Sequence, residues 1–183
     1  MNIFYLHKKS KECAEQHCDK HVVKMILEYA QLLSTAHRVI DGKEYIDASS
    51  GRKIKRWSLP DQCRESILYK ATHINHPSAV WARQSAENYR WLHSLLVDLC
   101  QEYTHRYGKV HKCQQIGLVD KLQTVPTNIN KESKFTEPTP AMPDMYKVLG
   151  DSIQSYRNYY INEKKTFAKW KKRTVPEWFN NTK

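Results

Sequence analysis

Five consecutive residues with chemically active side chains, HCDKH at positions 17–21, begin a segment with helical periodicity. On a helix of about 3.6 residues per turn, His21 and Glu28 point in nearly the same direction, at the edge of the apolar stripe, with Lys24 beside them on the polar side. A carboxylate half-buried among apolar groups has its pKa raised, and nearby cations lower it, so Glu28 is a candidate acid or base. The plainer interpretation is a His21–Glu28 hydrogen bond that ties helices together.

The same segment also allows a metal site. Cys13, His17 and His21 follow one another at intervals that place them on one helix face, and Cys18 is adjacent. Thiolate and imidazole groups are the usual ligands of Zn²⁺, although this spacing matches no standard zinc finger. Buried cysteines that only pack are commoner. Metal binding therefore stays an alternative, and no cofactor is expected.

Two other clusters are candidates for contacts with phosphate. His73, Asn75 and His76 precede a predicted helix N-terminus, where backbone N–H groups attract anions, although a capping turn is the plainer explanation. Near the end of the chain, basic residues interleave with Phe167 and Trp170, which fits a phosphate-binding surface and a solvated face equally well. The candidate phosphate contacts are His17, Lys20, His73, Asn75, His76, Arg83, Lys169, Lys171, Lys172 and Arg173.

The elements that must position these residues are predicted to be mainly helical. Apolar periodicity and end signals predict, in chain order, helix 13–40, a basic loop or short hairpin over 41–60, helix 61–70, helix 78–107 and helix 151–170. Asp61 and Asp151 are the expected N-caps of their helices. Ser78 or Asn75 is the expected N-cap of the long central helix, and Gly108 is its expected C-terminal end. Residues 110–143 contain Pro126, Pro138, Pro140 and Pro143 and predict a long loop or insert.

Length and composition favour one compact helical domain over residues 1–183, with long irregular loops. There are 30 Lys and Arg against 19 Asp and Glu, a formal charge of +11, which favours a polyanionic partner such as nucleic acid. No apolar run is long enough to cross a membrane. The five cysteines are odd in number and scattered, and no signal peptide is recognised, so we expect reduced thiols and a cytoplasmic location, which is the host cytoplasm if the protein is viral.

Three short motifs resemble a known family. Asp19, His21 and Glu28 give the pattern D-x-H-x6-E on one early helix, Asn75-His76-Pro77 opens the central helix, and PEWF at 176–179 ends the chain after Arg173. Together they resemble the pyrimidine-dimer DNA glycosylases of the endonuclease V type known from phage. The chain is also similar to small uncharacterised proteins of phages and large DNA viruses.

The resemblance implies a compact helical protein that binds duplex DNA as a monomer and flips a nucleotide out of the stack. In that family an amine attacks deoxyribose C1′, the base departs, and the resulting Schiff base undergoes β-elimination that nicks the strand. Carried onto this chain, the resemblance makes Glu28 the acid–base group and His21 the residue that positions the sugar or phosphate.

The resemblance leaves the nucleophile open. The family uses the amine of an N-terminal Thr, whereas Asn2 stands at that position here, and Asn is a poor context for removal of Met1. The candidate amines are those of Met1, Asn2, Lys20 and Lys24. The family's two arginines, one beside its Glu and one at its N-terminus, are replaced by Leu27 and Ile3.

Three hypotheses follow. The first is a base-excision enzyme, a glycosylase with or without lyase activity, that acts on a damaged or modified pyrimidine in DNA. The second is a nucleic-acid-binding viral accessory protein without catalysis. The third is a zinc-stabilised helical protein that binds another protein.

Overall fold

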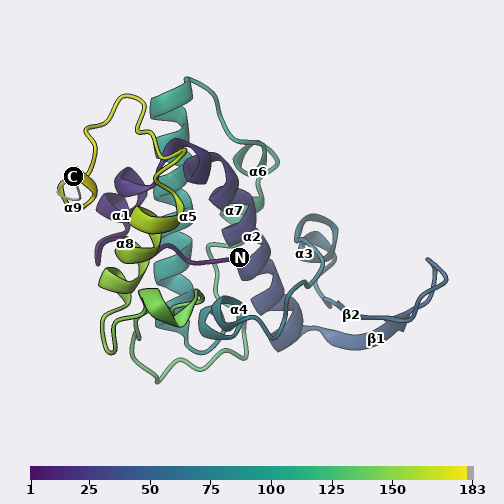
Figure 1. Ribbon diagram of the computed structural model, residues 1–183. Helices are drawn as coiled ribbons and strands as arrows, with labels where there is room; N and C mark the ends of the chain where they lie inside the picture. Colours follow the sequence, from purple (N-terminus) through teal and green to yellow (C-terminus); the bar gives the residue numbers. More distant parts are fainter. Residues whose placement is uncertain (181–183) are drawn as a thin grey trace.

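Two long helices, α2 (Asp19–Asp41) and α5 (Ala86–Tyr107), lie against each other and form the frame of the protein (Figure 1). The computed structural model describes residues 1–180. Both helices bury an apolar face, with Ile26 and Leu33 of α2 and Leu96 of α5 fully buried. Gly108 ends α5 in the left-handed conformation at φ 66°, as expected for a helix C-cap. The prediction of a mainly helical fold is confirmed.

The first predicted helix is two helices rather than one. Helix α1 (Ser10–Gln16) ends at His17, and α2 begins after Cys18, whose backbone is extended at φ −68° and ψ 161°. The N–H of Asp19 donates to the carbonyl of Lys169 at 2.8 Å, so the distant C-terminal segment takes over a bond that a continuous helix would have made itself. The prediction of one helix over 13–40 is wrong for this reason.

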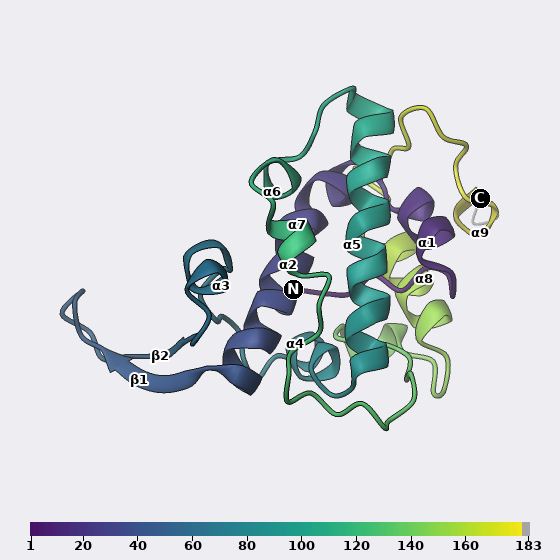
Figure 2. The ribbon, with the colours of Figure 1, turned by 180° about the vertical axis from the view of Figure 1, so that it is seen from behind.

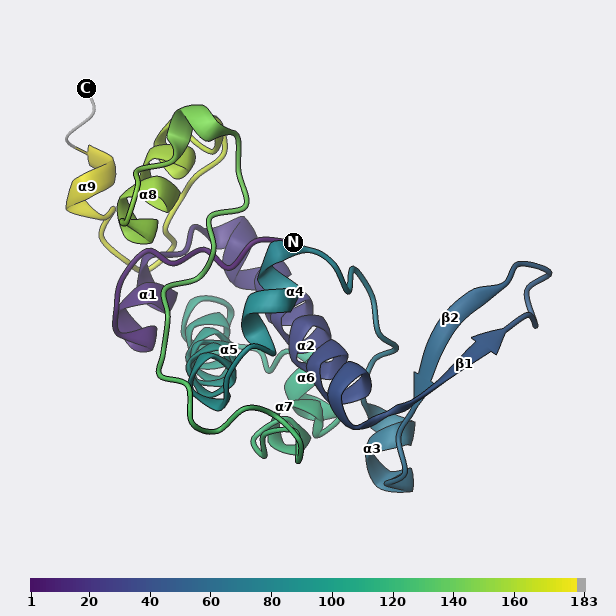
Figure 3. The same ribbon diagram turned by 90° about the horizontal axis from the view of Figure 1, so that it is seen from below.

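The first six residues run through the core as an irregular segment. Residues 3–6 are each at most 5% exposed. Their backbone is held by side chains from several helices, because Phe4 N–H donates to the Tyr29 hydroxyl at 3.1 Å and Arg157 donates to the Leu6 carbonyl at 2.9 Å. All three ribbon views place the N-terminus beside α2 (Figures 1, 2 and 3).

Residues 41–60 form the hairpin that was one of the two predicted alternatives. Strands β1 (Lys43–Asp47) and β2 (Ile54–Ser58) pair antiparallel, with Lys43 opposite Ser58. The helix before them must end in glycine, because a Cβ at Gly42 would lie 2.3 Å from the Arg38 carbonyl oxygen. Helix α3 (Gln62–Ile67) follows, and Asp61 caps it as predicted, accepting from Cys63 N–H at 2.9 Å.

The predicted helix over 78–107 is also interrupted. Helix α4 (Pro77–Ala82) is capped by the His76 ring, not by Ser78 or Asn75, and it stops at Arg83. Ser85 then starts α5, accepting from Asn88 N–H at 3.1 Å. A serine in the extended conformation provides a new N-cap, which the apolar periodicity across the break conceals.

Residues 110–143 are largely a loop, with two short helices that the sequence did not predict, α6 (Lys112–Gln115) and α7 (Leu118–Lys121). The loop is held against the helices, since Trp81 Nε1–H donates to the Thr136 carbonyl at 3.0 Å. Figure 2 shows α7 lying beside α5.

A short 3₁₀ helix η1 (Asp144–Tyr146), helix α8 (Ser152–Glu163) and helix α9 (Glu177–Asn180) complete the chain. Asp151 caps α8 as predicted, but α8 ends at Glu163 and not near Trp170, because residues 164–176 turn back over the start of α2. No helix within residues 1–180 is both long and apolar enough to cross a membrane. The last three residues of the predicted domain, 181–183, lie outside the described residues.

Candidate active site

A polar cavity of about 220 Å³ opens where the N-terminal segment, α2 and α8 meet. It is lined by Met1, Asn2, Phe4, His21, Lys24, Met25, Glu28, Tyr159 and Lys164. All five predicted catalytic residues line this one cavity: Met1, Asn2, His21, Lys24 and Glu28. Helical spacing predicts that His21, Lys24 and Glu28 of α2 lie close together. It cannot predict that the distant N-terminal segment joins them.

The carboxylate of Glu28 lies between two amines. One oxygen is 3.9 Å from the α-amine of Met1, and the other is 3.1 Å from Lys24 Nζ. The two amines differ in access, since the Lys24 side chain is 69% exposed, while those of Met1 and Glu28 are 7% and 14% exposed. The α-amine thus belongs to a residue whose side chain is nearly buried, whereas Lys24 Nζ is carried by an exposed side chain.

The N-terminal segment is held in register by hydrogen bonds on both sides. Ser78 Oγ donates to the Met1 carbonyl at 3.3 Å, and Phe4 N–H donates to the Tyr29 hydroxyl. Tyr29 in turn donates to His17 Nε2 at 3.2 Å, because His17 Nδ1–H is committed to the Cys13 carbonyl at 2.7 Å. These buried polar bonds fix the position of the α-amine relative to α2.

His21 is held on one face of its ring and at one ring nitrogen. Its ring stacks on Phe4 at a centroid distance of 4.2 Å, and Nδ1 lies 2.5 Å from the Tyr160 hydroxyl. Because Tyr160 accepts from Cys18 N–H at 3.4 Å, we assign its own proton to His21 Nδ1, which leaves Nε2–H as a donor on the cavity side. Burial, with help from the charges of His17 and Lys164, lowers the pKa of His21 to about 3, so the ring is neutral near pH 7.

His76 stands close to the same two charged groups. Its Nδ1 accepts from Ser78 N–H at 3.2 Å as the cap of α4. Desolvation lowers its pKa, and the positive α-amine of Met1 adds to this, while Glu28 opposes it. The predicted His73–His76 cluster is therefore split: His76 borders the site, whereas His73 and Asn75 are exposed on the surface before α4.

Tyr159, Tyr160 and Lys164, which the sequence did not single out for this site, lie at or beside the cavity. Lys164 Nζ lies 4.4 Å from the centroid of the Tyr159 ring and 3.3 Å from its hydroxyl. Lys20 Nζ lies 4.6 Å from the centroid of Phe167 on the same side of α2. Tyr159, Tyr160 and Lys164 come from α8 and its C-terminus. Only the tertiary fold brings them to α2, so no local sequence signal could identify them.

Of the remaining predicted phosphate contacts, some are buried or already paired, and the others are exposed. His17 is fully buried with both ring nitrogens bonded, so its prediction as a surface contact is wrong. Arg173 is engaged by Glu102 at 2.8 Å and by Glu15 at 3.2 Å. Arg83 is half-buried at the end of α4. The side chains of Lys20, Lys169, Lys171 and Lys172 are exposed.

The side chains proposed as zinc ligands do not form a metal site. Within residues 1–180, no three His, Cys, Asp or Glu side chains gather in a way that could hold a metal ion. Burial raises the pKa of the Cys13 thiol to about 12, and its Sγ–H donates to the Phe4 carbonyl at 3.2 Å. A protonated thiol that is bonded in this way serves the packing of the N-terminal segment.

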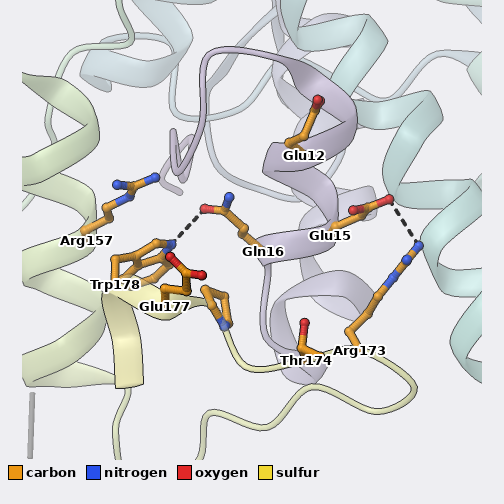
Figure 4. Close-up of a pocket in the computed structure, with 9 residues that line it drawn as sticks. Glu12, Glu15, Gln16, Arg157, Arg173, Thr174, Glu177 and Trp178 are labelled. Carbon is orange, nitrogen blue, oxygen red and sulfur yellow. Dashed lines mark hydrogen bonds and ion pairs between the residues drawn. The ribbon is translucent and has the colours of Figure 1, made fainter. Parts of the chain in front are cut away.

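A second cavity, of about 450 Å³, lies between α1, α8 and the C-terminal segment (Figure 4). It is charged, but its cations are already bound. Arg173 pairs with Glu15 and Glu102, and both Nε and Nη2 of Arg157 donate to the Leu6 carbonyl. The residues that line this cavity include carboxylates but no amine. Comparisons with family models, with curated proteins and with solved structures found no match for the chain.

Proposed function

We propose that the protein is a DNA base-excision enzyme, a glycosylase with lyase activity, that uses the α-amine of Met1 as nucleophile and Glu28 as acid–base group. The observation that carries the proposal is the amine–carboxylate pair in the polar cavity, at 3.9 Å with both side chains nearly buried. The proposed substrate is a damaged or modified pyrimidine nucleotide in duplex DNA. The charge of +11 supports a polyanionic partner.

The chemistry assigned to the site follows from these groups. The Met1 amine gives up a proton to Glu28 and attacks C1′ of a flipped nucleotide. The C1′–N bond breaks, the base leaves with the bonding electrons and takes up a proton, and the sugar ring opens to an imine on Met1. Loss of a C2′ proton then expels the 3′ phosphate. A carboxylate next to both the amine and the sugar can serve each proton transfer.

Neighbouring groups support binding of the sugar–phosphate. The Nε2–H of His21 is a neutral donor toward the cavity, and Lys24 and Lys164 supply positive charge. A cavity of about 220 Å³ is small compared with the roughly 300–1,000 Å³ of typical ligand pockets. Its size suits one sugar or one base.

Borohydride trapping tests the proposal directly. The purified chain is incubated with duplexes that carry an abasic site or a modified pyrimidine, and sodium borohydride reduces any imine to a stable adduct. We expect an adduct with abasic DNA whose mass-mapped attachment is the α-amine of Met1. Absence of an adduct with every duplex would refute the proposal and favour a binding protein without catalysis.

Three variants assign the roles. Glu28→Gln should slow adduct formation by about a hundredfold or more, within the range for loss of an acid–base group, while DNA binding remains. An uncleaved N-terminal extension should abolish the adduct, because it removes the free amine from the cavity. Lys24→Ala should retain the adduct at Met1. An adduct that persists with the extension and disappears with Lys24→Ala would move the nucleophile to Lys24.

A further inference from the structure

The β1–β2 hairpin stands apart from the helices. In all three ribbon views it projects away from the rest of the protein, beyond the C-terminal end of α2 (Figures 1, 2 and 3). A two-stranded hairpin is marginally stable on its own in water, so its base must be fixed. Trp57 is 8% exposed at that base, and its carbonyl accepts from the buried Arg38 at 2.8 Å.

The hairpin is strongly basic for its size. Residues 43–58 contain five Lys or Arg and two acidic residues, a net charge of +3. Lys55 is paired with Glu44 at 3.0 Å. In the part of the chain that the structure describes, none of the other four hairpin cations has an ion-pair partner within 4.0 Å; these are Lys43, Arg52, Lys53 and Arg56.

Exposed side chains accompany these charges. Tyr45 lies directly opposite Arg56 in the strand register and is 40% exposed, and Arg52 and Lys53 are exposed in the turn. A two-stranded ribbon is one of the shapes that the major groove of duplex DNA admits, and free cations at its tip match the phosphates along the groove edge.

We propose that the hairpin is an arm that contacts the backbone of duplex DNA on one side of the site around Glu28. This inference rests on the proposed function for the identity of the duplex as partner. Asp41 lies thirteen residues after Glu28 on α2, which is about 20 Å along the helix. At about 3.4 Å per base pair, the arm begins to touch the duplex roughly six base pairs from the flipped nucleotide.

The first test uses undamaged duplex, so that it does not depend on catalysis. The variant Arg52→Ser/Lys53→Ser changes only exposed turn residues, and Lys131→Ser/Lys134→Ser is the matched control with the same loss of charge in another exposed loop. Binding is measured by fluorescence anisotropy between 50 and about 200 mM salt. The arm variant should bind about tenfold more weakly and lose about 1.8 from the slope of log K against log salt, whereas the control should lose little.

The second test shortens the duplex on either side of an abasic site and measures the rate of adduct formation. The natural protein should lose rate only when the flank on the side of the arm falls below roughly six base pairs, and the arm variant should lose rate on neither side. Equal losses of DNA affinity in the arm and control variants, or no loss in either, would refute the proposed role of the hairpin. Absence of any adduct would instead refute the proposed chemistry, while the anisotropy result would still decide the arm.

Discussion

At the scale of single residues, two tyrosines connect the backbone to two histidines in the same way. Phe4 N–H donates to Tyr29, which donates to His17, and Cys18 N–H donates to Tyr160, which donates to His21. Each tyrosine hydroxyl thus accepts a hydrogen bond from a backbone N–H and donates one to an imidazole nitrogen. The first series of hydrogen bonds ends in the core at His17. The second leaves a ring nitrogen of His21 on the cavity side.

The Tyr160 bond predicts the tautomer of His21, and burial predicts its charge state. We expect ¹⁵N NMR of the ring to show a neutral His21 with its proton on Nε2 from pH 5 to 8, because burial lowers its pKa to about 3. Tyr160→Phe should remove this preference. The variant should also slow adduct formation. A His21 ring that titrates near pH 6.5, or that carries its proton on Nδ1, would contradict the assignment.

The sequence identified the half of the site that lies on one helix. His21, Lys24 and Glu28 fall on one side of α2 because helical spacing is a local property. Tyr159 and Lys164 reach the cavity only through tertiary packing, and the 3.9 Å approach of the Met1 amine depends on the path of residues 1–6 through the core. His17 was misassigned because a histidine near the polar side of a predicted helix gives no sign of burial by a neighbouring element.

At the scale of elements, Arg38 joins α2 to the hairpin and to α3. Its fully buried guanidinium donates to the carbonyls of Trp57, Leu68 and Tyr69, and it pairs with Glu65 at 2.6 Å. Although desolvation opposes it, bonds from Leu59 N–H, Lys70 and Arg38 bring the pKa of Glu65 down to about 2. One side chain therefore satisfies backbone acceptors both in β2 and in the segment that follows α3.

Removal of this side chain should loosen the hairpin before the rest of the fold. Arg38→Ala removes the donor to the carbonyls of Trp57, Leu68 and Tyr69, and a buried acceptor left without its partner costs about 1–3 kcal/mol, so we expect a loss of about 3–5 kcal/mol in urea unfolding. Arg90→Ala is the control, since it breaks an exposed pair with Glu87 and should cost less than about 1 kcal/mol. Equal costs for the two variants would show that Arg38 has no special structural role.

Element boundaries were predicted well where a residue signals them locally. Asp61, Asp151 and Gly108 each mark a helix end through their own side chain or backbone freedom. The break at Cys18 has no such signal, because the carbonyl of Lys169 makes it. The break before Ser85 carried a signal, an N-capping serine, but continuous apolar spacing across it outweighed that signal.

At the scale of the whole molecule, three buried histidines link stability to pH. Burial is the main cause of their low pKa values, which are about 4 for His17 and His37 and about 3 for His21. Their pKa in the unfolded chain is about 6.5. As the pH falls below that value, the unfolded chain takes up protons that the folded protein cannot, so the free energy of unfolding decreases.

We therefore expect stability to be full above about pH 7 and to fall between about pH 6.5 and 4, by up to about 1.4 kcal/mol per pH unit for each histidine. Urea unfolding at pH 7.5, 6 and 5 measures this, above the range where most carboxylates titrate. His37→Gln should reduce the slope by about one third, because it removes one of the three buried rings. A flat profile from pH 7.5 to 5 would contradict the burial of these neutral rings.

The path of residues 1–6 through the core also has a consequence for the timing of synthesis. Leu6 is held by Arg157, and Met1 by Ser78, so the segment cannot settle until most of the chain has left the ribosome. At about 5–20 residues per second, the α-amine stays in open solution for roughly 8 to 30 seconds. Enzymes that trim or acetylate new chains act in that interval. Whether the α-amine is still free when the segment settles is thus decided by competition between those enzymes and the last helices to fold.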